Sequence, residues 1–431
     1  MSMTEQAKLA KEAAVKLATL PTKIKNKALL EIAKSIKKNS KSIINENKKD
    51  IEAAKKSNLN NVLIKRLKID ENKISEMIEE IRSVIKLEDP VGKILSQMEL
   101  DKGLMLYQVT CPIGVIGAIF ESRPDAVTQI SSLCLKSGNA VIMKGGSEAI
   151  NSNRILVKII SETAEENWIP KGFVQLIETR GQVSEMIKLY EDIDLIIPRG
   201  SNSFVKYIKE NSMIPVLGHS EGICHVYIDK DADIKKAVGI SFDAKCQYPA
   251  VCNAMETLLV HKDIAKKFLP QMIGKFKEVN VEVRGDALTK KIANNIKNAT
   301  EEDWDTEYNN LVLSIKVVNN LDEAINHINK HSSKHTDSIV TENRKSAEIF
   351  MNLVDSASVM WNASTRFADG FRFGKGAEVG ISTSKIHARG PVGLEGLVIY
   401  KYKLIGKGHV VKDYTGKDAK KYKHRIIKKL F

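Results

Sequence analysis

Aromatic residues and cysteines are scarce in this chain of 431 residues, and each shortage excludes a class of protein. Phe, Trp and Tyr make up 6% of the residues, and no segment interleaves them with basic side chains as a platform for single-stranded nucleic acid does. The five cysteines contain no CxxC pair, and an odd, sparse set argues against a disulfide framework and for a reducing compartment.

Long apolar runs are missing as well. One of the longest, Gly114–Phe120, is far shorter than the roughly 18 residues of a membrane-spanning helix. Residues Met1–Lys16 mix acids with lysines and contain no apolar core of a signal peptide. We therefore expect a cytoplasmic protein with no membrane partner.

Basic residues exceed acidic ones by 67 to 53, a net charge of +14. This excess favours anionic partners without choosing among nucleic acid, a membrane surface and phosphorylated small molecules. Part of it lies in Lys417–Lys429, which has the composition of a solvated end. We expect no nucleic-acid partner, and a basic polyanion-binding protein stays as the alternative from another class.

The pattern of apolar residues predicts an α/β protein of two domains, or three. Residues 4–86 repeat apolar side chains at helical spacing, and residues 95–110 have the pattern of a β-hairpin turning at Asp101–Gly103. From residue 114 onward, short apolar strands alternate with helices, which predicts a doubly wound parallel sheet. The alternation restarts after Asp229, so we expect a second α/β domain there. A late strand at 396–404 has no partner after it and is expected to pair with the hairpin or with another subunit.

Two loops that follow expected strands suit an anion. Met143–Glu148 contains Lys144, Gly145, Gly146 and Ser147 at the expected start of a long helix, where backbone N–H groups and the helix dipole favour negative charge. Arg199, Gly200 and Ser201 follow a later strand in the same way. A helix capped by Ser147 beside a surface lysine is the alternative interpretation.

Cys252 is the candidate nucleophile, because it lies on a loop where the second domain begins and a thiolate attacks carbonyl carbon well. A buried structural cysteine is the alternative interpretation. Cys134 and Cys224 lie within an expected helix and strand and are expected in the core, which leaves Cys246 as the close competitor.

The histidines 327, 331 and 335 have a spacing that invites a metal site, but we expect none. Ser332 and Ser333 suggest that the helix stops before the third histidine, and no cysteine or carboxylate cluster supplies further ligands. A Walker lysine loop, an HExxH motif and a GxSxG motif are all missing from the sequence.

Five segments together resemble the aldehyde dehydrogenase superfamily over almost the full length, and within it the γ-glutamyl phosphate reductase family. They are Pro112–Pro124 with Leu135–Glu148, Val251–Thr257, Val318–Ile339, Thr365–Gly370 and His387–Pro391. The resemblance implies an aldehyde dehydrogenase-like fold. It also implies an NADP-dependent oxidoreductase of proline biosynthesis that reduces γ-glutamyl phosphate to glutamate 5-semialdehyde with NADPH.

The resemblance assigns roles to individual residues. Cys252 would form a thioacyl enzyme, and Lys144 would hold the adenosine ribose or its phosphate. The neighbouring Gly145, Gly146 and Ser147, the loop Arg199, Gly200 and Ser201, and Glu307 at the nicotinamide ribose complete the expected cofactor contacts. The expected substrate contacts are Ser122, Arg123, Asn362 and Arg366, chosen for position and charge complementarity.

Two positions of this sequence differ from the pattern of the superfamily, and each changes what we expect of the site. Hydrolytic relatives carry a glutamate base in a Glu-Leu-Gly-Gly stretch, and the comparable segment here is Val216–His219, so water is poorly activated against a thioester. Another superfamily member, hydrolytic or coenzyme A-acylating, is the alternative within the same class. The asparagine that stabilises the oxyanion in relatives corresponds roughly to Ser122, which leaves the backbone N–H of Cys252 as the expected donor.

The resemblance also implies the domain organisation and the partners. We expect an NADPH-binding domain over 1–95 and 112–224, a catalytic domain over 225–393, and an oligomerisation element over 96–111 and 394–415. A basic C-terminal tail is expected over 416–431. We expect a homo-oligomer whose labile substrate, γ-glutamyl phosphate, comes from a separate glutamate 5-kinase by transient contact.

Overall fold

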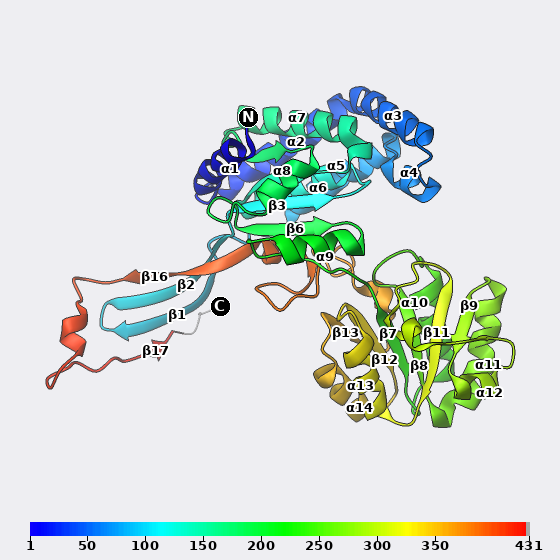
Figure 1. Cartoon of the computed structure of the whole chain (residues 1–431). Coiled ribbons are helices and arrows are strands. Elements are labelled where there is room, and N and C mark those ends of the chain that lie inside the picture. Colours follow the sequence, from blue (N-terminus) through cyan, green and yellow to red (C-terminus); the bar gives the residue numbers. More distant parts are fainter. Residues whose placement is uncertain (428–431) are drawn as a thin grey trace.

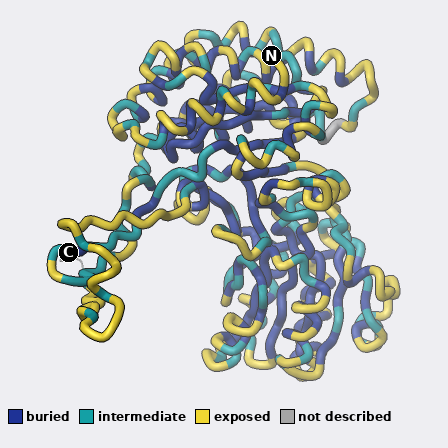
Figure 2. The backbone as a smooth tube through the Cα atoms, turned by 60° about the vertical axis from the view of Figure 1, so that its left-hand side comes forward, coloured by how far each residue is buried: buried dark blue, intermediate teal, exposed yellow. Residues whose placement is uncertain are grey.

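A computed structural model describes residues 1–427, the side chains of residues 61 and 62 excepted. Within these residues the chain forms two lobes and a projecting arm (Figure 1). Buried residues lie mainly in the sheets and the inner helix faces of the two lobes, whereas the outer part of the arm is largely exposed (Figure 2). No helix of residues 1–427 combines the length and the apolar character needed to cross a membrane.

The first lobe is a parallel sheet of order β5-β4-β3-β6 with helices packed around it. Its helices are α1 (Met3–Leu17), α2 (Thr22–Lys38), α3 (Ser40–Lys56), α4 (Asn61–Leu67), α5 (Glu71–Lys86), α6 (Ala126–Ser137), α7 (Ile150–Glu166), α8 (Arg180–Met186) and α9 (Asn202–Asn211). Its strands are β3 (Val115–Phe120), β4 (Ala140–Lys144), β5 (Val174–Leu176) and β6 (Leu195–Arg199). The 3-10 helix η1 (Ser147–Ala149) precedes α7.

The second lobe is a parallel sheet of order β10-β9-β11-β8-β7-β12-β13. Its strands are β7 (Cys224–Ile228), β8 (Met255–His261), β9 (Glu282–Gly285), β10 (Lys297–Asn298), β11 (Val312–Val318), β12 (Thr336–Val340) and β13 (Ser358–Trp361). Its helices are α10 (Ile234–Cys246), α11 (Lys262–Glu278), α12 (Ala287–Ile292), α13 (Leu321–His331) and α14 (Arg344–Leu353), with the 3-10 helices η2 (Glu301–Asp305) and η3 (Thr365–Phe367). One apolar core lies under α10 and α11, and another under α13 and α14.

The parallel pairing expected from the short apolar strands is confirmed in both lobes. In the first lobe, β3 is buried at every residue, and β4 is buried at every residue except the last. Strands covered by helices on both faces bury both sets of side chains, which is why they read as continuous apolar runs.

The arm is an antiparallel sheet of order β16-β2-β1-β17. The hairpin β1 (Ile94–Asp101) and β2 (Leu104–Pro112) turns at Gly103, whose φ of +79° suits glycine. Strand β16 (Val398–Ile405) pairs with β2 along its whole length, so the late strand joins the hairpin of its own chain.

The chain returns to the first lobe before it enters the arm. The small sheet of β14 (Gly380–Ser382) and β15 (Gly390–Val392) and the 3-10 helix η4 (Leu394–Leu397) follow the second lobe in sequence. Apolar side chains between Ala377 and Leu397 nevertheless join the core of the first lobe. This placement differs from the expected assignment of residues up to 393 to the second domain, because the pattern of a short strand does not show which core covers it.

The basic segment at the C-terminus is not a free tail over its described part. The 3-10 helix η5 (Val411–Tyr414) follows β16, and β17 (Arg425–Ile426) pairs with β1. The Tyr414 hydroxyl donates to Asp101 at 3.0 Å, and the Tyr414 and Tyr422 rings stack with centroids 4.5 Å apart. The segment 416–427 therefore packs on the arm, and residues 428–431 lie outside the described part.

Candidate active site

Cys252 lies on the loop between α10 and β8. Arg66 of the first lobe donates to the carbonyl oxygen of Ala250 on this loop at 3.4 Å, so the loop lies where the two lobes meet. Gly222, just before β7, packs directly on its backbone, since a Cβ built on Gly222 would stand 2.1 Å from the Cys252 carbonyl oxygen and 2.4 Å from its Cα. The Cys224 thiol donates to the same carbonyl oxygen at 3.2 Å. The loop is thus pressed against the chain that enters the second lobe.

Both ends of the Cys252 loop are anchored. Lys245, near the end of α10, forms a fully buried ion pair of 2.5 Å with Glu256 at the start of β8. Burial raises the pKa of the Glu256 carboxyl to about 7 in spite of that lysine. The Asn253 amide donates to the Ala368 carbonyl oxygen at 2.9 Å, which attaches the loop to the segment after η3.

The other cysteines differ from Cys252 in environment. Cys134 and Cys224 are fully buried, as expected for core cysteines, and burial raises the pKa of both thiols. Cys246 is half-buried at the end of α10, where burial raises its thiol pKa to about 11. A thiol with that pKa is almost wholly protonated at neutral pH, which weakens Cys246 as a competitor.

Cys252 is among the groups that act on the pKa of two arginines, Arg199 at the end of β6 and Arg366 in η3. Burial and the nearby Arg123 lower the pKa of Arg199, and Cys252 acts in the opposite direction. Burial and Arg372 lower the pKa of Arg366, again opposed by Cys252. The Arg366 Nε donates to the Gln247 side chain at 3.0 Å, which aligns it beside the cysteine loop. An anionic substrate would find positive charge on both sides of the thiol.

Arg199 contacts Glu378, which precedes β14. Its Nη1 donates to the Glu378 carbonyl oxygen at 3.5 Å, and its Nη2 lies 3.9 Å from the Glu378 carboxylate. Arg123, whose charge acts on Arg199, is itself exposed.

Ser122 and Asn362 use their polar atoms on protein partners. The Ser122 backbone N–H and hydroxyl both donate to a Glu148 carboxylate oxygen, at 2.5 and 2.7 Å. The Asn362 side chain accepts from the Thr341 N–H and donates to the Thr341 carbonyl oxygen, both at 3.0 Å. The Ser122 and Asn362 side chains are therefore occupied in holding loops, whereas Arg366 contacts the start of the cysteine loop through Gln247.

The segment from Lys144 to Ser147 forms a tight turn after β4. A Cβ on Gly145 would stand 2.0 Å from the Asn153 side-chain nitrogen, and neither polar atom of that buried Asn153 amide has a hydrogen-bond partner among the described residues. The ammonium of Lys144 forms no ion pair within residues 1–427. A free ammonium, close backbone approach and unpartnered amide atoms fit the polar ribose and phosphate groups of a dinucleotide.

The interpretation of Ser147 as the N-cap of a long helix is wrong. Ser147 opens the 3-10 helix η1, and α7 begins only at Ile150. Asp50 of α3 supplies the cap, because its carboxylate accepts from the N–H groups of Asn151 and Ser152 at 3.1 and 2.8 Å. The positive end of α7 is thereby satisfied by a protein carboxylate, so Lys144 and the turn amides remain as the anion-binding groups.

The second expected cofactor loop lies at the junction of the lobes. The Ser201 N–H donates to Glu121 at 3.2 Å, and Gly200 packs against the same carboxylate. Asn202, the first residue of α9, donates to the Glu307 carboxylate at 3.1 Å. Glu307 of the second lobe thus reaches the loop of the first lobe, as a residue that contacts a ligand between them would.

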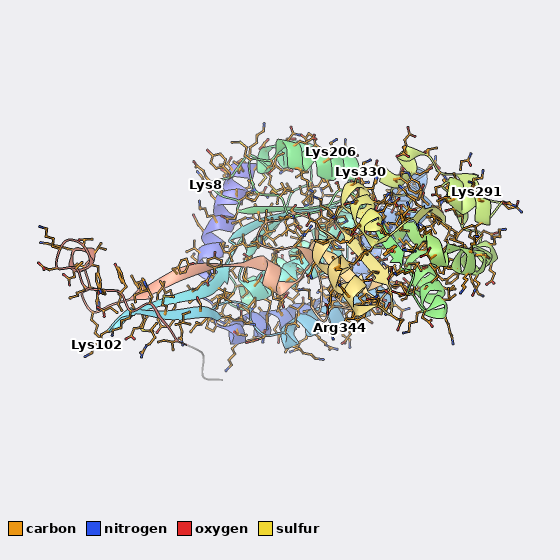
Figure 3. The ribbon with its side chains drawn as sticks, turned by 90° about the horizontal axis from the view of Figure 1, so that it is seen from below. Lys8, Lys102, Lys206, Lys291, Lys330 and Arg344 are labelled. Atoms are coloured by element: carbon orange, nitrogen blue, oxygen red, sulfur yellow. The ribbon has the colours of Figure 1, made fainter. Side chains whose placement is uncertain are left out.

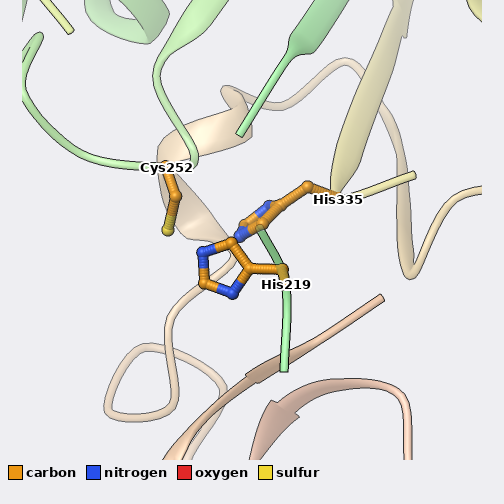
Figure 4. Close-up of side chains that lie close together, drawn as sticks. All are labelled: His219, Cys252 and His335. Carbon is orange, nitrogen blue, oxygen red and sulfur yellow. The ribbon is translucent and has the colours of Figure 1, made fainter. Parts of the chain in front are cut away.

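Two histidines lie beside Cys252, a position that the sequence analysis did not predict for either of them. His219 and His335 present ring nitrogens within 4.8 Å of the Cys252 sulfur and of each other (Figure 4). The available signal for His219 was its position at the end of the Val216–His219 stretch, where the hydrolytic relatives' base is absent. His327 and His331 lie on α13, apart from this cluster, and their ring centroids are 4.5 Å apart. Helix α13 ends before His335, as expected.

Comparison with known proteins shows the family of this chain. Residues 2–301 match the model of the aldehyde dehydrogenase family. A γ-glutamyl phosphate reductase of Acetivibrio thermocellus is 58% identical over 431 residues, which cover all of both chains. One of Methanococcoides burtonii is 56% identical over 97% of this chain and 95% of its own.

The fold is also shared with a solved relative. The crystal structure of the γ-glutamyl phosphate reductase of Thermotoga maritima matches with a TM-score of 0.93 at 44% identity, over 95% of this chain and 100% of that one. The aldehyde dehydrogenase-like α/β fold is therefore confirmed, and with it an oxidoreductase class that uses a nicotinamide cofactor. The chain belongs to the γ-glutamyl phosphate reductase family of the aldehyde dehydrogenase superfamily.

Proposed function

We propose that this chain reduces L-γ-glutamyl 5-phosphate to L-glutamate 5-semialdehyde with NADPH and releases inorganic phosphate, the second step of proline biosynthesis. The observation that carries the proposal is the position of the Cys252 sulfur, within 4.8 Å of the ring nitrogens of His219 and His335. Arg366 contacts the start of the same loop through Gln247, and Cys252 acts on the pKa of both Arg199 and Arg366. An acyl phosphate is both an acylating agent and an anion, so it suits a nucleophile between cations.

The first chemical step belongs to Cys252. Its sulfur forms a bond to the acyl carbon while the bond from that carbon to the phosphate oxygen breaks, so a thioester remains on the enzyme and phosphate leaves. The thiol proton passes to one of the neighbouring imidazoles, since the ring nitrogens of His219 and His335 are within 4.8 Å. Arg199 and Arg366 balance the charge of the departing phosphate.

Lys144, Gly145 and Asn153 in the first lobe and Glu307 in the second are the residues that would hold the cofactor. A nicotinamide dinucleotide supplies the hydride that reduces an acyl group to an aldehyde when it is bound. Lys144 would pair with the ribose phosphate of NADPH. Val216 offers no carboxylate to activate water, so the thioester is protected from hydrolysis.

The reverse reaction tests this proposal. Purified protein should reduce NADP with glutamate 5-semialdehyde only when inorganic phosphate is supplied. Turnover that proceeds unchanged without phosphate would place the chain with the hydrolytic relatives, and dependence on coenzyme A in place of phosphate with the acylating ones.

Matched cysteine variants identify the nucleophile. Cys252→Ala should abolish turnover and retain NADPH binding, measured by the change in nicotinamide fluorescence, whereas Cys246→Ala should retain turnover. Activity that survives in Cys252→Ala and disappears in Cys246→Ala would reverse the assignment.

The proposal extends to the setting of the enzyme. A cytoplasmic homo-oligomer would receive its labile substrate from a separate glutamate 5-kinase by transient contact.

A further inference from the structure

Three side chains of types that can bind transition metals lie close together, and they come from three separate segments of the chain. His219 lies on the chain that leads into β7, Cys252 on the loop before β8, and His335 just before β12. One sulfur and two imidazole nitrogens lie within 4.8 Å of one another. Figure 4 shows the Cys252 side chain directed toward the His219 and His335 rings. Sulfur and imidazole nitrogen are the ligands that zinc takes most often in proteins.

The second nitrogen of each ring is already fixed by the protein. His219 Nδ1 lies 3.0 Å from the Ile381 carbonyl oxygen, so it carries the proton and leaves Nε2 free to coordinate. His335 Nδ1 lies 2.8 Å from the Thr336 hydroxyl. Its Nε2 is buried without a hydrogen-bond partner in the described part of the chain, and the side chain is 1% exposed. Metal-bound histidines are oriented in this manner through their other nitrogen.

The size of the cluster suits a small tetrahedral cation. Zinc bonds of about 2.0–2.3 Å hold nitrogen and sulfur ligands roughly 3.5 Å apart. The upper limit of 4.8 Å here exceeds that spacing by about 1 Å, which rotation of the Cys252 side chain can close. Three protein ligands leave a fourth position for water, as in open zinc sites.

The positive charges of nearby arginines and the ligand types of the cluster favour a cation of the zinc class over Mg²⁺ and Ca²⁺. Arg199 and Arg366 oppose any positive ion near the sulfur, so only a cation that bonds strongly to thiolate and imidazole gains enough to bind. Mg²⁺ and Ca²⁺ require oxygen ligands, and the cluster supplies none.

We propose that His219, Cys252 and His335 form a reversible site for a divalent cation of the zinc class, and that the bound cation blocks the Cys252 nucleophile. On binding, the sulfur–hydrogen bond is replaced by a sulfur–metal bond and the proton leaves to solvent. The blocking of turnover rests on the proposed function, whereas binding of the cation does not.

Cobalt is the probe of binding. Full-length protein freed of metal with a chelator is titrated with Co²⁺, and a thiolate-to-cobalt charge-transfer absorption should appear at one equivalent and disappear when Zn²⁺ is added. Cys252→Ser should lack this absorption. Its absence from the unaltered protein, or its persistence in Cys252→Ser, would overturn the proposal.

Histidine variants identify the nitrogen ligands. His335→Gln and His219→Gln should each weaken Co²⁺ binding by at least the 10–100-fold or so that loss of an outer-shell partner costs. His424→Gln, an exposed histidine on the arm, is the matched control and should bind as the unaltered protein does. Equal affinity in all three variants would overturn the assignment of the ligands.

Alkylation of the unaltered protein gives a test that needs no variant to fold. Zn²⁺ should slow the reaction of Cys252 with iodoacetamide by about tenfold or more, measured by peptide mass, and Mg²⁺ should leave it unchanged. Unprotected Cys252 at saturating Zn²⁺ would refute the site. Spectrum and alkylation rate require no turnover, so they distinguish failure of this proposal from failure of the reductase assignment.

Discussion

At the scale of single residues, the position of Cys252, the proposed nucleophile, depends on a glycine that has no reactive side chain. Gly222 lies against the backbone of Cys252, and the atoms that a Cβ would meet first are the carbonyl oxygen, the Cα and the carbonyl carbon of that residue. Backbone cannot rotate out of the way as a long side chain can, so any larger residue at 222 must displace the loop.

We therefore expect Gly222→Ala to lower kcat by at least about tenfold, because a shift of about 1 Å in the reacting group is enough for losses of that order. The free energy of unfolding should fall by about 1–3 kcal/mol. Gly239→Ala in α10 is the control, since its Cβ would meet no atom within 4 Å, and it should leave kcat unchanged. A Gly222→Ala enzyme with unaltered kcat would show that the loop tolerates the displacement.

Lys144 carries the proposed preference for NADPH. Its ammonium has no ion-pair partner within residues 1–427, so replacing it leaves no unpaired carboxylate behind. Lys144→Gln should lower kcat/KM for NADPH by about tenfold or more, the value of one charge-assisted hydrogen bond, and change that for NADH less. Lys206→Gln, an exposed lysine of α9, is the control. Equal losses with the two cofactors would place the phosphate of NADPH elsewhere.

At the scale of elements, α13 carries a histidine that stays neutral in the folded protein. His327 is buried between Trp304 and the His225 and His331 rings, and Lys316 lies 3.4 Å from its Nδ1. Burial and the repulsion of His225 and Lys316 lower the pKa of His327 to about 2. The unfolded chain binds a proton at this residue near pH 6.5, and the folded chain does not.

The contribution of His327 to stability is consequently complete above pH 6.5 and is lost as the pH falls below it. Urea unfolding should show the free energy declining by up to about 1.4 kcal/mol per pH unit from this residue. His327→Gln should reduce that slope, and the exposed His424→Gln should not. An unchanged slope in His327→Gln would mean that other groups account for the acid sensitivity.

At the scale of the whole molecule, the arm exposes a stripe of large apolar and aromatic side chains on β16. Tyr400, Tyr402 and Leu404 alternate along β16 and are 52%, 62% and 58% exposed. Alternate residues of a strand share a face, so the three side chains form one surface. The labelled basic side chains, in contrast, are spread over the arm and both lobes (Figure 3).

We expect this stripe to be the contact of the proposed homo-oligomer. The double variant Tyr402→Glu, Leu404→Glu should sediment as a smaller particle in analytical ultracentrifugation, because two buried carboxylates without partners oppose association. Trp168→Glu, at a site 78% exposed on the first lobe, is the control and should leave the mass unchanged. An unaltered mass of the double variant would assign the contact to another surface.

Much of the architecture followed from local patterns. The hairpin at Gly103, the parallel strands of both lobes and the end of α13 before His335 lie where the spacing of apolar and turn residues put them. The prediction that the helix begins at Ser147 was wrong, because the residue that caps α7 is Asp50, about a hundred positions earlier in the chain. The prediction of a solvated tail over residues 416–431 was wrong for the same reason in its described part, because β17 pairs with β1, which lies far away in the sequence.

The sequence by itself therefore determined the family and the parallel α/β lobes and pointed to Cys252 as the candidate nucleophile, since motifs and apolar periods are properties of neighbouring residues. Only the tertiary structure decided what surrounds that sulfur. His219 and His335 reach the sulfur, and Gly222 the backbone of Cys252, from segments far apart in the chain, and such contacts are set by tertiary packing.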